Sequence, residues 1–108
     1  MPTRYAVSFT QTAISDLEEI WTFIAEDDVE QATKFILKLE GQVSSLERFP
    51  ERCPLIAENE LMNTRYRHLV WADYRTIFRI SGRAVYIMRI IHGARLLSNS
   101  PLESASPD

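Results

Sequence analysis

The chain has one cysteine, three glycines and no long apolar run. Cys53 has no partner for an internal disulfide, so we expect a protein of the reducing cytoplasm. No apolar stretch approaches the roughly 18–20 residues that a membrane-spanning helix needs, and the N-terminal residues show no signal-peptide pattern. A glycine-rich phosphate loop is also missing. The sequence therefore predicts neither a membrane span nor that kind of phosphate binding.

Combinations of residues that bind metals or cleave bonds are equally scarce. His68 and His92 lack a third ligand at a useful spacing, and Cys53 is far from both in sequence. No order of serine, histidine and aspartate typical of a catalytic triad can be assigned. We expect the acidic pairs at residues 18–19 and 27–28 to lie on solvated helix surfaces rather than to act as catalytic acids. The sequence accordingly predicts no metal and no cofactor.

The 108 residues, of which 45% are apolar and 25% charged, have the composition of an ordinary globular domain. A chain of this length buries roughly 65% of its unfolded surface, which is enough for one core of helices and a sheet. We expect a single domain over residues 1–97. Residues 98–108 are rich in serine and proline, and we expect them to form a flexible tail.

The net charge of −3 hides an uneven distribution. Residues 1–63 carry 5 Lys/Arg and 12 Asp/Glu, a net charge of −7. Residues 64–95 carry 7 arginines and one acid, Asp73, a net charge of +6, and the remainder adds two acids. This asymmetry indicates a face made for an anionic partner. The alternative is that the arginines only solvate the open side of a sheet.

The acidic half has the pattern of a strand followed by two helices. Residues 5–9 alternate as a short strand, and Thr10 or Thr12 is placed to cap the helix that follows. Asp28 is placed to cap a second helix, which we expect to run to Phe49 before Pro50. A tight connection predicts that the two helices form an antiparallel hairpin. The apolar stripes that define them are Ala13, Ile14, Leu17, Ile20, Trp21 and Ile24, and then Ala32, Phe35, Ile36, Leu39, Val43, Leu46 and Phe49.

The basic half has the pattern of three successive strands, at residues 65–70, 74–80 and 84–92. A connection at residues 51–63, with a short helical turn near residues 58–62, precedes them. In the second strand, Arg75, Ile77 and Arg79 share one face, opposite Tyr74, Thr76, Phe78 and Ile80. In the third strand, Val85, Ile87, Arg89 and Ile91 share one face, opposite Ala84, Tyr86, Met88, Ile90 and His92.

The predicted fold class is α+β, with an N-terminal strand, an antiparallel helix hairpin and a three-stranded antiparallel meander in the order β-α-α-β-β-β. Two helices can cover only one face of such a sheet. The reverse face would then keep apolar residues beside arginines, which suits a macromolecular partner. The alternative is that the sheet curls and its own loops cover that face.

One group of residues has chemical potential: Arg65, Arg67, His68, Arg75, Arg79, Arg89, His92 and Arg95. Arginine can hold a phosphate with two hydrogen bonds and neutralise charge in phosphoryl transfer. Histidine can transfer a proton near neutral pH. Metal-free RNA cleavage is therefore chemically open to this set, although only His68, His92 or Tyr86 would supply an acid or base.

The order of these elements over about residues 4–97 resembles the RelE/ParE superfamily of bacterial toxins from type II toxin–antitoxin pairs. The segments that carry the resemblance are Tyr74-Arg75-x-Ile77-Phe78-Arg79-Ile80, Arg89-Ile90-Ile91-His92-Gly93-Ala94-Arg95, Ala13-x-x-x-Leu17 and Leu46-x-x-Phe49-Pro50. The ending His-Gly-Ala-Arg after an apolar strand is typical of the ParE-like branch. The resemblance implies a cytoplasmic toxin that causes growth arrest and that a small cognate antitoxin holds inactive in a hetero-oligomer.

The two branches of this superfamily imply different targets. ParE-like members poison DNA gyrase by binding, and RelE-like members cut mRNA in the ribosome. Arg75 matches the arginine after tyrosine in the RelE-like middle strand, and Arg95 roughly matches a late basic position. The late tyrosine of many nucleolytic members is missing, and Lys34 and Lys38 are the only lysines, whereas ribosome-directed members are rich in lysine. Both departures favour the ParE-like interpretation.

We therefore expect a gyrase-directed toxin whose partner-binding residues are Arg75, Arg79, Arg89, His92 and Arg95. The alternative is a ribosome-dependent mRNA endonuclease with Arg65, Arg67, Arg75, His92 and Arg95 as candidate catalytic residues. A third hypothesis is a non-toxic relative that only binds a partner.

Overall fold

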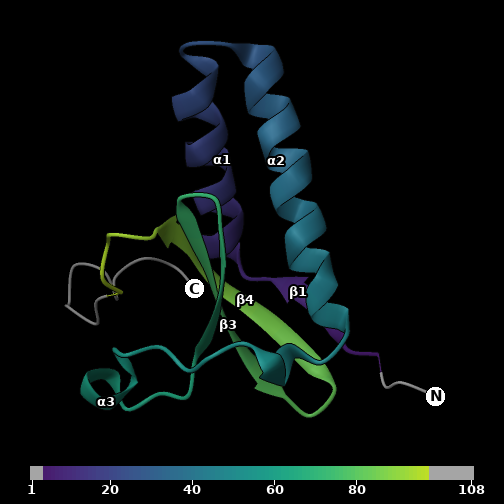
Figure 1. The fold of residues 1–108 in the computed structure, drawn as a ribbon, viewed down its shortest axis with the longest axis vertical. Coiled ribbons are helices and arrows are strands. Elements are labelled where there is room, and N and C mark those ends of the chain that lie inside the picture. Colours follow the sequence, from purple (N-terminus) through teal and green to yellow (C-terminus); the bar gives the residue numbers. More distant parts are fainter. Residues whose placement is uncertain (1–3, 98–108) are drawn as a thin grey trace.

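Four strands and two long helices make up the computed structural model, which describes residues 4–97. In chain order, the elements are β1 (Ala6–Phe9), α1 (Gln11–Ala25), α2 (Val29–Ser44), the 3-10 turns Ser45–Glu47 and Pro50–Arg52, the short helix α3 (Asn59–Met62), β2 (Arg67–Trp71), β3 (Tyr74–Ser81) and β4 (Ala84–His92). The α+β class, the order of elements and the helix hairpin predicted from the sequence are confirmed (Figure 1). The tail predicted at residues 98–108 lies outside the described residues.

The strands form one mixed sheet in the order β1-β4-β3-β2. β2, β3 and β4 form the predicted antiparallel meander, and β1 pairs with β4 in parallel, with Ala6 opposite Ala84 and Phe9 opposite Ile87. Parallel neighbours need a long crossover, and the helix hairpin together with the β2–β3 meander provides it. The first and last strands of the described chain therefore lie side by side in the sheet.

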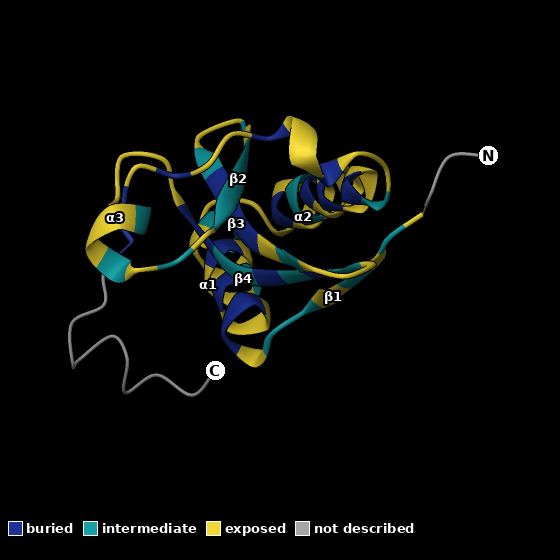
Figure 2. Cartoon of the chain, turned by 90° about the horizontal axis from the view of Figure 1, so that it is seen from below, coloured by how far each residue is buried: buried dark blue, intermediate teal, exposed yellow. Residues whose placement is uncertain are grey.

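The helix hairpin covers one face of this sheet and supplies the main core. Ile20 of α1 and Leu39 and Val43 of α2 are buried against Phe78, Val85 and Ile87. Figure 2 shows the buried residues concentrated where the helices meet the strands, while the outward sides of both helices are exposed. The turn that joins α1 to α2 extends beyond the sheet (Figure 1). None of the helices in the described part of the chain is both long and apolar enough to cross a bilayer.

Two side chains fix where the helices begin. Thr10 is the N-cap of α1, where its Oγ1 accepts a hydrogen bond from the Ala13 N–H at 3.2 Å and donates one to the Ile87 carbonyl at 2.8 Å. Asp28 is the N-cap of α2 and accepts from the Gln31 N–H at 3.1 Å. Both predicted caps are confirmed, and Thr10 rather than Thr12 caps the first helix.

The second helix ends earlier than its apolar pattern predicts. α2 stops at Ser44 instead of continuing to Phe49, and Leu46 reaches the core from the 3-10 turn that follows. Phe49 adopts a left-handed conformation with φ 49° and is 66% exposed. The residue before a proline is disfavoured in a helix, and here Pro50 starts a new turn of its own. The assignment of Phe49 to the buried stripe is therefore wrong.

A β-bulge in β4 changes which residues share a face. Ile77 pairs with Arg89 but Phe78 pairs with Ile87, so Met88 has no direct partner across the strands. Ile87 and Ile90 both pack in the core beneath the helices, whereas Ile91 packs on the reverse face. The predicted grouping of residues in β4 therefore holds only as far as the bulge, because strict alternation assumes an uninterrupted ladder.

The reverse face of the sheet is covered in part by the chain itself. Ile77 and Ile91 are buried there beneath Ile56 and Leu97, and Met62 and Tyr66 pack around them. The connection between α2 and β2 supplies part of this cover, and Leu97 adds to it from the segment after β4. The connection contains α3, which confirms the predicted helical turn and lies apart from the hairpin (Figures 1 and 2). The expectation of an open reverse face is wrong over this region, and its alternative, cover by loops, is what the structure has.

Candidate functional site

Arg75 of β3 is a predicted site residue whose side chain makes several bonds inside the protein. Its side chain is buried in an ion pair with Glu58, which lies just before α3. Nη2 of Arg75 contacts Oε2 of Glu58 and donates to the Arg95 carbonyl at 2.9 Å. Oε2 of Glu58 also accepts from the Leu97 N–H at 2.9 Å. The pair thus fixes the backbone of residues 95–97 against the reverse face of the sheet.

His68 of β2 lies beside this ion pair. Its Nδ1 is 3.2 Å from Nη1 of Arg75. Because arginine only donates hydrogen bonds, that nitrogen must be an acceptor and the imidazole is neutral. Burial, with the positive charge of Arg75 as a further cause, holds the pKa of His68 below its usual value of 6.5. Histidine here stabilises the guanidinium rather than carrying its own charge.

Glu58 remains a carboxylate at every physiological pH. Its hydrogen bond with Arg75 lowers its pKa from 4.5 to about 2. A general acid or base works best when its pKa lies near the operating pH. Glu58 is therefore poorly suited to moving protons at neutral pH, and its arrangement with Arg75 is that of a structural ion pair.

A second buried ion pair joins α1 to β4. Nε and Nη2 of Arg89 donate to the two oxygens of Asp16 at 2.8 and 3.1 Å. Oδ2 of Asp16 also accepts from the Ile90 N–H at 2.9 Å. β1 ends opposite Ile87, so no strand pairs with this part of the β4 edge, and Asp16 satisfies the backbone there. Arg89 consequently holds the helix on the sheet.

The other predicted residues lie in separate places. Arg67 donates to the Cys53 carbonyl at 2.6 Å and to the Glu51 carbonyl at 3.2 Å. Arg79 is exposed and stacks over Tyr86, with 4.4 Å between the guanidinium carbon and the ring centre.

Exposed residues lie at the end of β4. Nδ1 of His92 accepts from the Ala94 N–H at 3.2 Å, and its ring lies 5.7 Å from that of Tyr74. Arg95 is exposed, as is Arg65 before β2. A hollow of about 180 Å³ separates the end of β4 from α1, with Glu19, Phe23, Tyr74, His92 and Arg95 among its lining residues. Within residues 4–97, no three His, Cys, Asp or Glu side chains are grouped so as to hold a metal ion.

A family profile described as "ParE toxin of type II toxin-antitoxin system, parDE" matches residues 7–97. The chain belongs to this ParE toxin family. The predicted RelE/ParE superfamily and its ParE-like branch are confirmed.

Two solved complexes contain chains of similar fold. A chain from the chromosomal ParDE toxin–antitoxin system of P. aeruginosa aligns with a TM-score of 0.65 and 22% identity, over 83% of this chain and 97% of that one. A chain from the RelBE2 toxin–antitoxin complex of Mycobacterium tuberculosis aligns with a TM-score of 0.52 and 27% identity, over 82% of this chain and 98% of that one. The comparison with curated proteins gives no match.

In this ParE-family toxin, the five predicted partner-binding residues fall into two groups. Arg75 and Arg89 face internal carboxylates, whereas Arg79, His92 and Arg95 are exposed. The excess positive charge of the sheet is therefore compensated in part by Asp16 and Glu58 from the acidic half of the chain. The charge pattern predicted that the arginines would share one face, but they do not all project from one open face.

Sequence reasoning missed the two carboxylates of the toxin that hold these arginines. Asp16 is not among the residues assigned to the apolar stripe of the first helix, yet it lies three residues after Ala13 and four before Ile20, on the buried side of the helix. Its position within the apolar stripe was the available signal. Glu58 lies in a segment without periodicity, and its burial depends on how the connection folds back over the sheet.

Proposed function

We propose that this ParE-family toxin poisons DNA gyrase by binding to it, and that a cognate antitoxin protein neutralises it in a hetero-oligomer in the cytoplasm. One observation carries the choice of binding over catalysis. Arg75, the central candidate for chemistry, directs its terminal nitrogens at Glu58, His68 and the Arg95 carbonyl. Its neighbours in that site have pKa values displaced away from neutrality. This arrangement supports a structural role for the cluster.

The exposed members of the predicted set are the proposed contact residues. A macromolecule can reach Arg79, His92 and Arg95. The Arg75–Glu58 pair positions the segment that carries Arg95, and the Arg89–Asp16 pair positions the strand that carries His92. Exposed arginines at protein interfaces contribute strongly when they become buried by the partner. Arg95 is the first residue of the segment 95–97, whose backbone the Glu58–Arg75 pair holds against the sheet. We therefore expect Arg95 to matter more for toxicity than an exposed arginine elsewhere.

A supercoiling assay tests this function directly. The purified chain should inhibit gyrase-catalysed supercoiling or accumulate cleaved DNA, and Arg95→Ala should weaken the effect at least tenfold because it removes a proposed contact. Arg48→Ala, which changes an exposed arginine in the α2–β2 connection, is the matched control and should act as the unchanged chain does. Complete supercoiling in the presence of a large molar excess of the chain would reject gyrase as the target.

The RelE-like alternative has one observation in its favour. Arg75 and His68, two residue types that metal-free RNA cleavage can use, lie side by side on the sheet, with 3.2 Å between Nη1 of Arg75 and Nδ1 of His68. If the chain cut mRNA on the ribosome, a translation extract containing it would yield shortened messages, and Arg75→Ala and Arg95→Ala would abolish the cleavage. We expect full-length messages. Unimpaired growth after induction of the chain alone would instead favour the non-toxic relative.

A further inference from the structure

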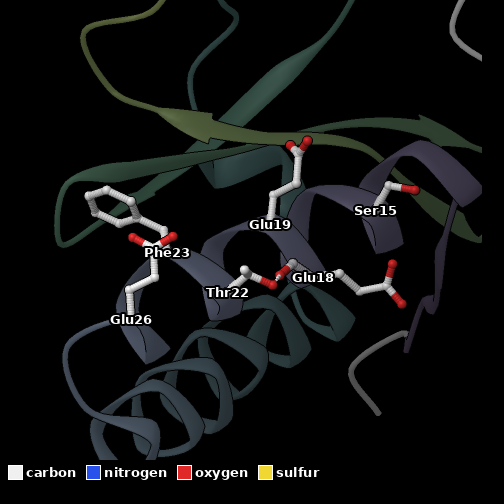
Figure 3. A pocket seen from close by; sticks show the side chains of 6 residues that line it. All are labelled: Ser15, Glu18, Glu19, Thr22, Phe23 and Glu26. Atoms are coloured by element: carbon white, nitrogen blue, oxygen red, sulfur yellow. Dashed lines mark hydrogen bonds between the residues drawn. The ribbon is translucent and has the colours of Figure 1, made fainter.

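The outer face of α1 has a surface composition unlike the rest of the hairpin. We define this face by the residues that line a hollow of about 470 Å³: Ser15, Glu18, Glu19, Thr22, Phe23 and Glu26. Figure 3 shows their side chains on successive turns of the helix, with Phe23 beside Glu26. No lysine or arginine occurs anywhere between Gln11 and Ala25. The face therefore combines three carboxylates with one large apolar side chain.

Phe23 has no structural reason to be in solvent. It is 70% exposed, whereas Ile20 and Ile24 on the neighbouring turn pack toward the sheet. The side of α1 that faces α2 is marked by Trp21, whose Nε1 donates to Thr33 Oγ1 at 3.2 Å. Since the core and the hairpin contact are made by other residues, the fold does not require an aromatic residue at position 23.

Phe23 also borders two further hollows. One of about 180 Å³ extends from Glu19 and Phe23 to His92 and Arg95 at the end of β4. Another of about 350 Å³ extends to Glu26 and Asp27, where the hairpin turns. Phe23 thus lines three hollows, and each of them is also lined by acidic side chains of α1 or of the hairpin turn. An apolar centre with a polar rim is the usual anatomy of a protein–protein contact.

We propose that the outer face of α1 is a docking surface for a cationic segment of another protein. An apolar side chain of that segment would pack on Phe23, and its lysines or arginines would lie beside Glu18, Glu19 and Glu26. A cation can also rest on the ring of Phe23 itself. The same carboxylates repel phosphate groups, so neither nucleic acid nor an anionic lipid surface fits this face. The proposal goes beyond the proposed action on gyrase, because it names a surface that adjoins His92 and Arg95 and gives the chemistry of its occupant.

The test uses the full chain and a defined probe. The probe is a fluorescein-labelled helical peptide of about 18 residues with leucines on one face and lysines and arginines beside them, and binding is followed by fluorescence anisotropy. We expect saturable binding that weakens with added salt, since exposed charges are screened. Phe23→Ala should weaken binding at least tenfold, and the double change Glu18→Gln/Glu26→Gln should do the same while reducing the salt dependence.

Matched variants on α2 separate this surface from general attraction by an acidic protein. Leu37→Ala removes an apolar side chain that is 62% exposed, and Glu30→Gln/Glu40→Gln removes two exposed acids. Both should bind the peptide within twofold of the unchanged chain. All of these positions are exposed, so thermal unfolding should be unaffected, and equal melting temperatures would exclude misfolding as the cause of any loss.

Three outcomes would overturn the proposal: equal losses in the α1 and α2 variants, equal binding of a peptide in which glutamates replace the lysines and arginines, or a dimer of the chain that Phe23→Ala converts to a monomer. The last outcome would make the face a contact between two copies. Retained peptide binding by a chain that leaves gyrase active would reject only the proposed target. Inhibition of gyrase by a chain that does not bind the peptide would reject only this docking surface.

Discussion

Two carboxylate–arginine pairs determine how the charged residues of this toxin are used. Glu58 and Arg75 join the α2–β2 connection to the sheet and hold the backbone at residues 95–97. Asp16 and Arg89 join α1 to the far end of β4. A charge taken from water is tolerated in a core only when its partner and further hydrogen bonds accompany it, and both pairs meet that condition. Residues that look like a binding surface in the sequence are thus partly internal connections.

Replacing Glu58 should be strongly destabilising. Glu58→Gln would leave the buried guanidinium of Arg75 without an opposite charge and would weaken the bond to the Leu97 N–H. Removing one partner of a buried ion pair costs roughly 3–5 kcal/mol of unfolding free energy. Urea denaturation measures the loss. Glu60→Gln, an exposed change on α3, is the control and should stay within about 0.5 kcal/mol of the unchanged chain.

A double change tests whether the cost comes from the unpaired charge. Adding Arg75→Met to Glu58→Gln removes the orphaned guanidinium and replaces it with an apolar side chain of similar length. Because a buried pair can often be exchanged for apolar residues with little loss, the double variant should recover part of the stability. A double variant less stable than Glu58→Gln alone would show that Arg75 contributes through its bonds to Arg95 and His68 instead.

Local sequence signals identified the individual helices and strands. Features that depend on long-range contacts, such as the bulge in β4 and the burial of Glu58, were not visible in those signals. Thr10, Asp28 and Pro50 each act on the backbone within a few residues, so their effects follow from the sequence. The bulge at Met88 depends on how β4 fits against β3 and β1 together, which no pattern within β4 reveals. Burial of Glu58 depends on a connection without periodicity. The antiparallel meander was therefore predictable, but the parallel pairing of β1 with β4, the bulge and the partners of the arginines were not.

The cap of α1 is an element-scale feature with a measurable effect. Thr10→Ala should cost about 1–2 kcal/mol of unfolding free energy, because it removes the acceptor for the Ala13 N–H and the donor to the Ile87 carbonyl. The loss can be measured by thermal or urea denaturation. Gln11→Ala, which changes the adjacent exposed residue inside the helix, should be close to neutral. Equal stability of Thr10→Ala and Gln11→Ala would mean that β4 alone sets the start of α1.

Across the whole molecule, the acidic and basic halves of the sequence are interleaved rather than set against each other. Asp16 of the helix hairpin and Glu58 of the connection each reach an arginine of the sheet. Other arginines at the sheet are exposed, and so is the acidic face on α1. A molecule with two oppositely charged surfaces can bind two partners of opposite charge, or one partner that carries both charges.

As pH is lowered, the free energy of unfolding of the whole molecule should decrease in two stages. Burial holds the pKa of His68 below 6.5, so the unfolded chain takes up a proton first and stability declines as pH falls from 6.5. Arg75 holds the pKa of Glu58 at about 2, so its contribution is complete above 4.5 and is lost as pH falls from 4.5 toward 2. Urea midpoints measured from pH 8 to pH 3 would show both stages.

Two variants separate the stages. Glu58→Gln should flatten the lower stage and His68→Gln the upper one, since each removes the titrating group. Curves for the variants that run parallel to that of the unchanged chain would mean that other carboxylates govern its acid unfolding.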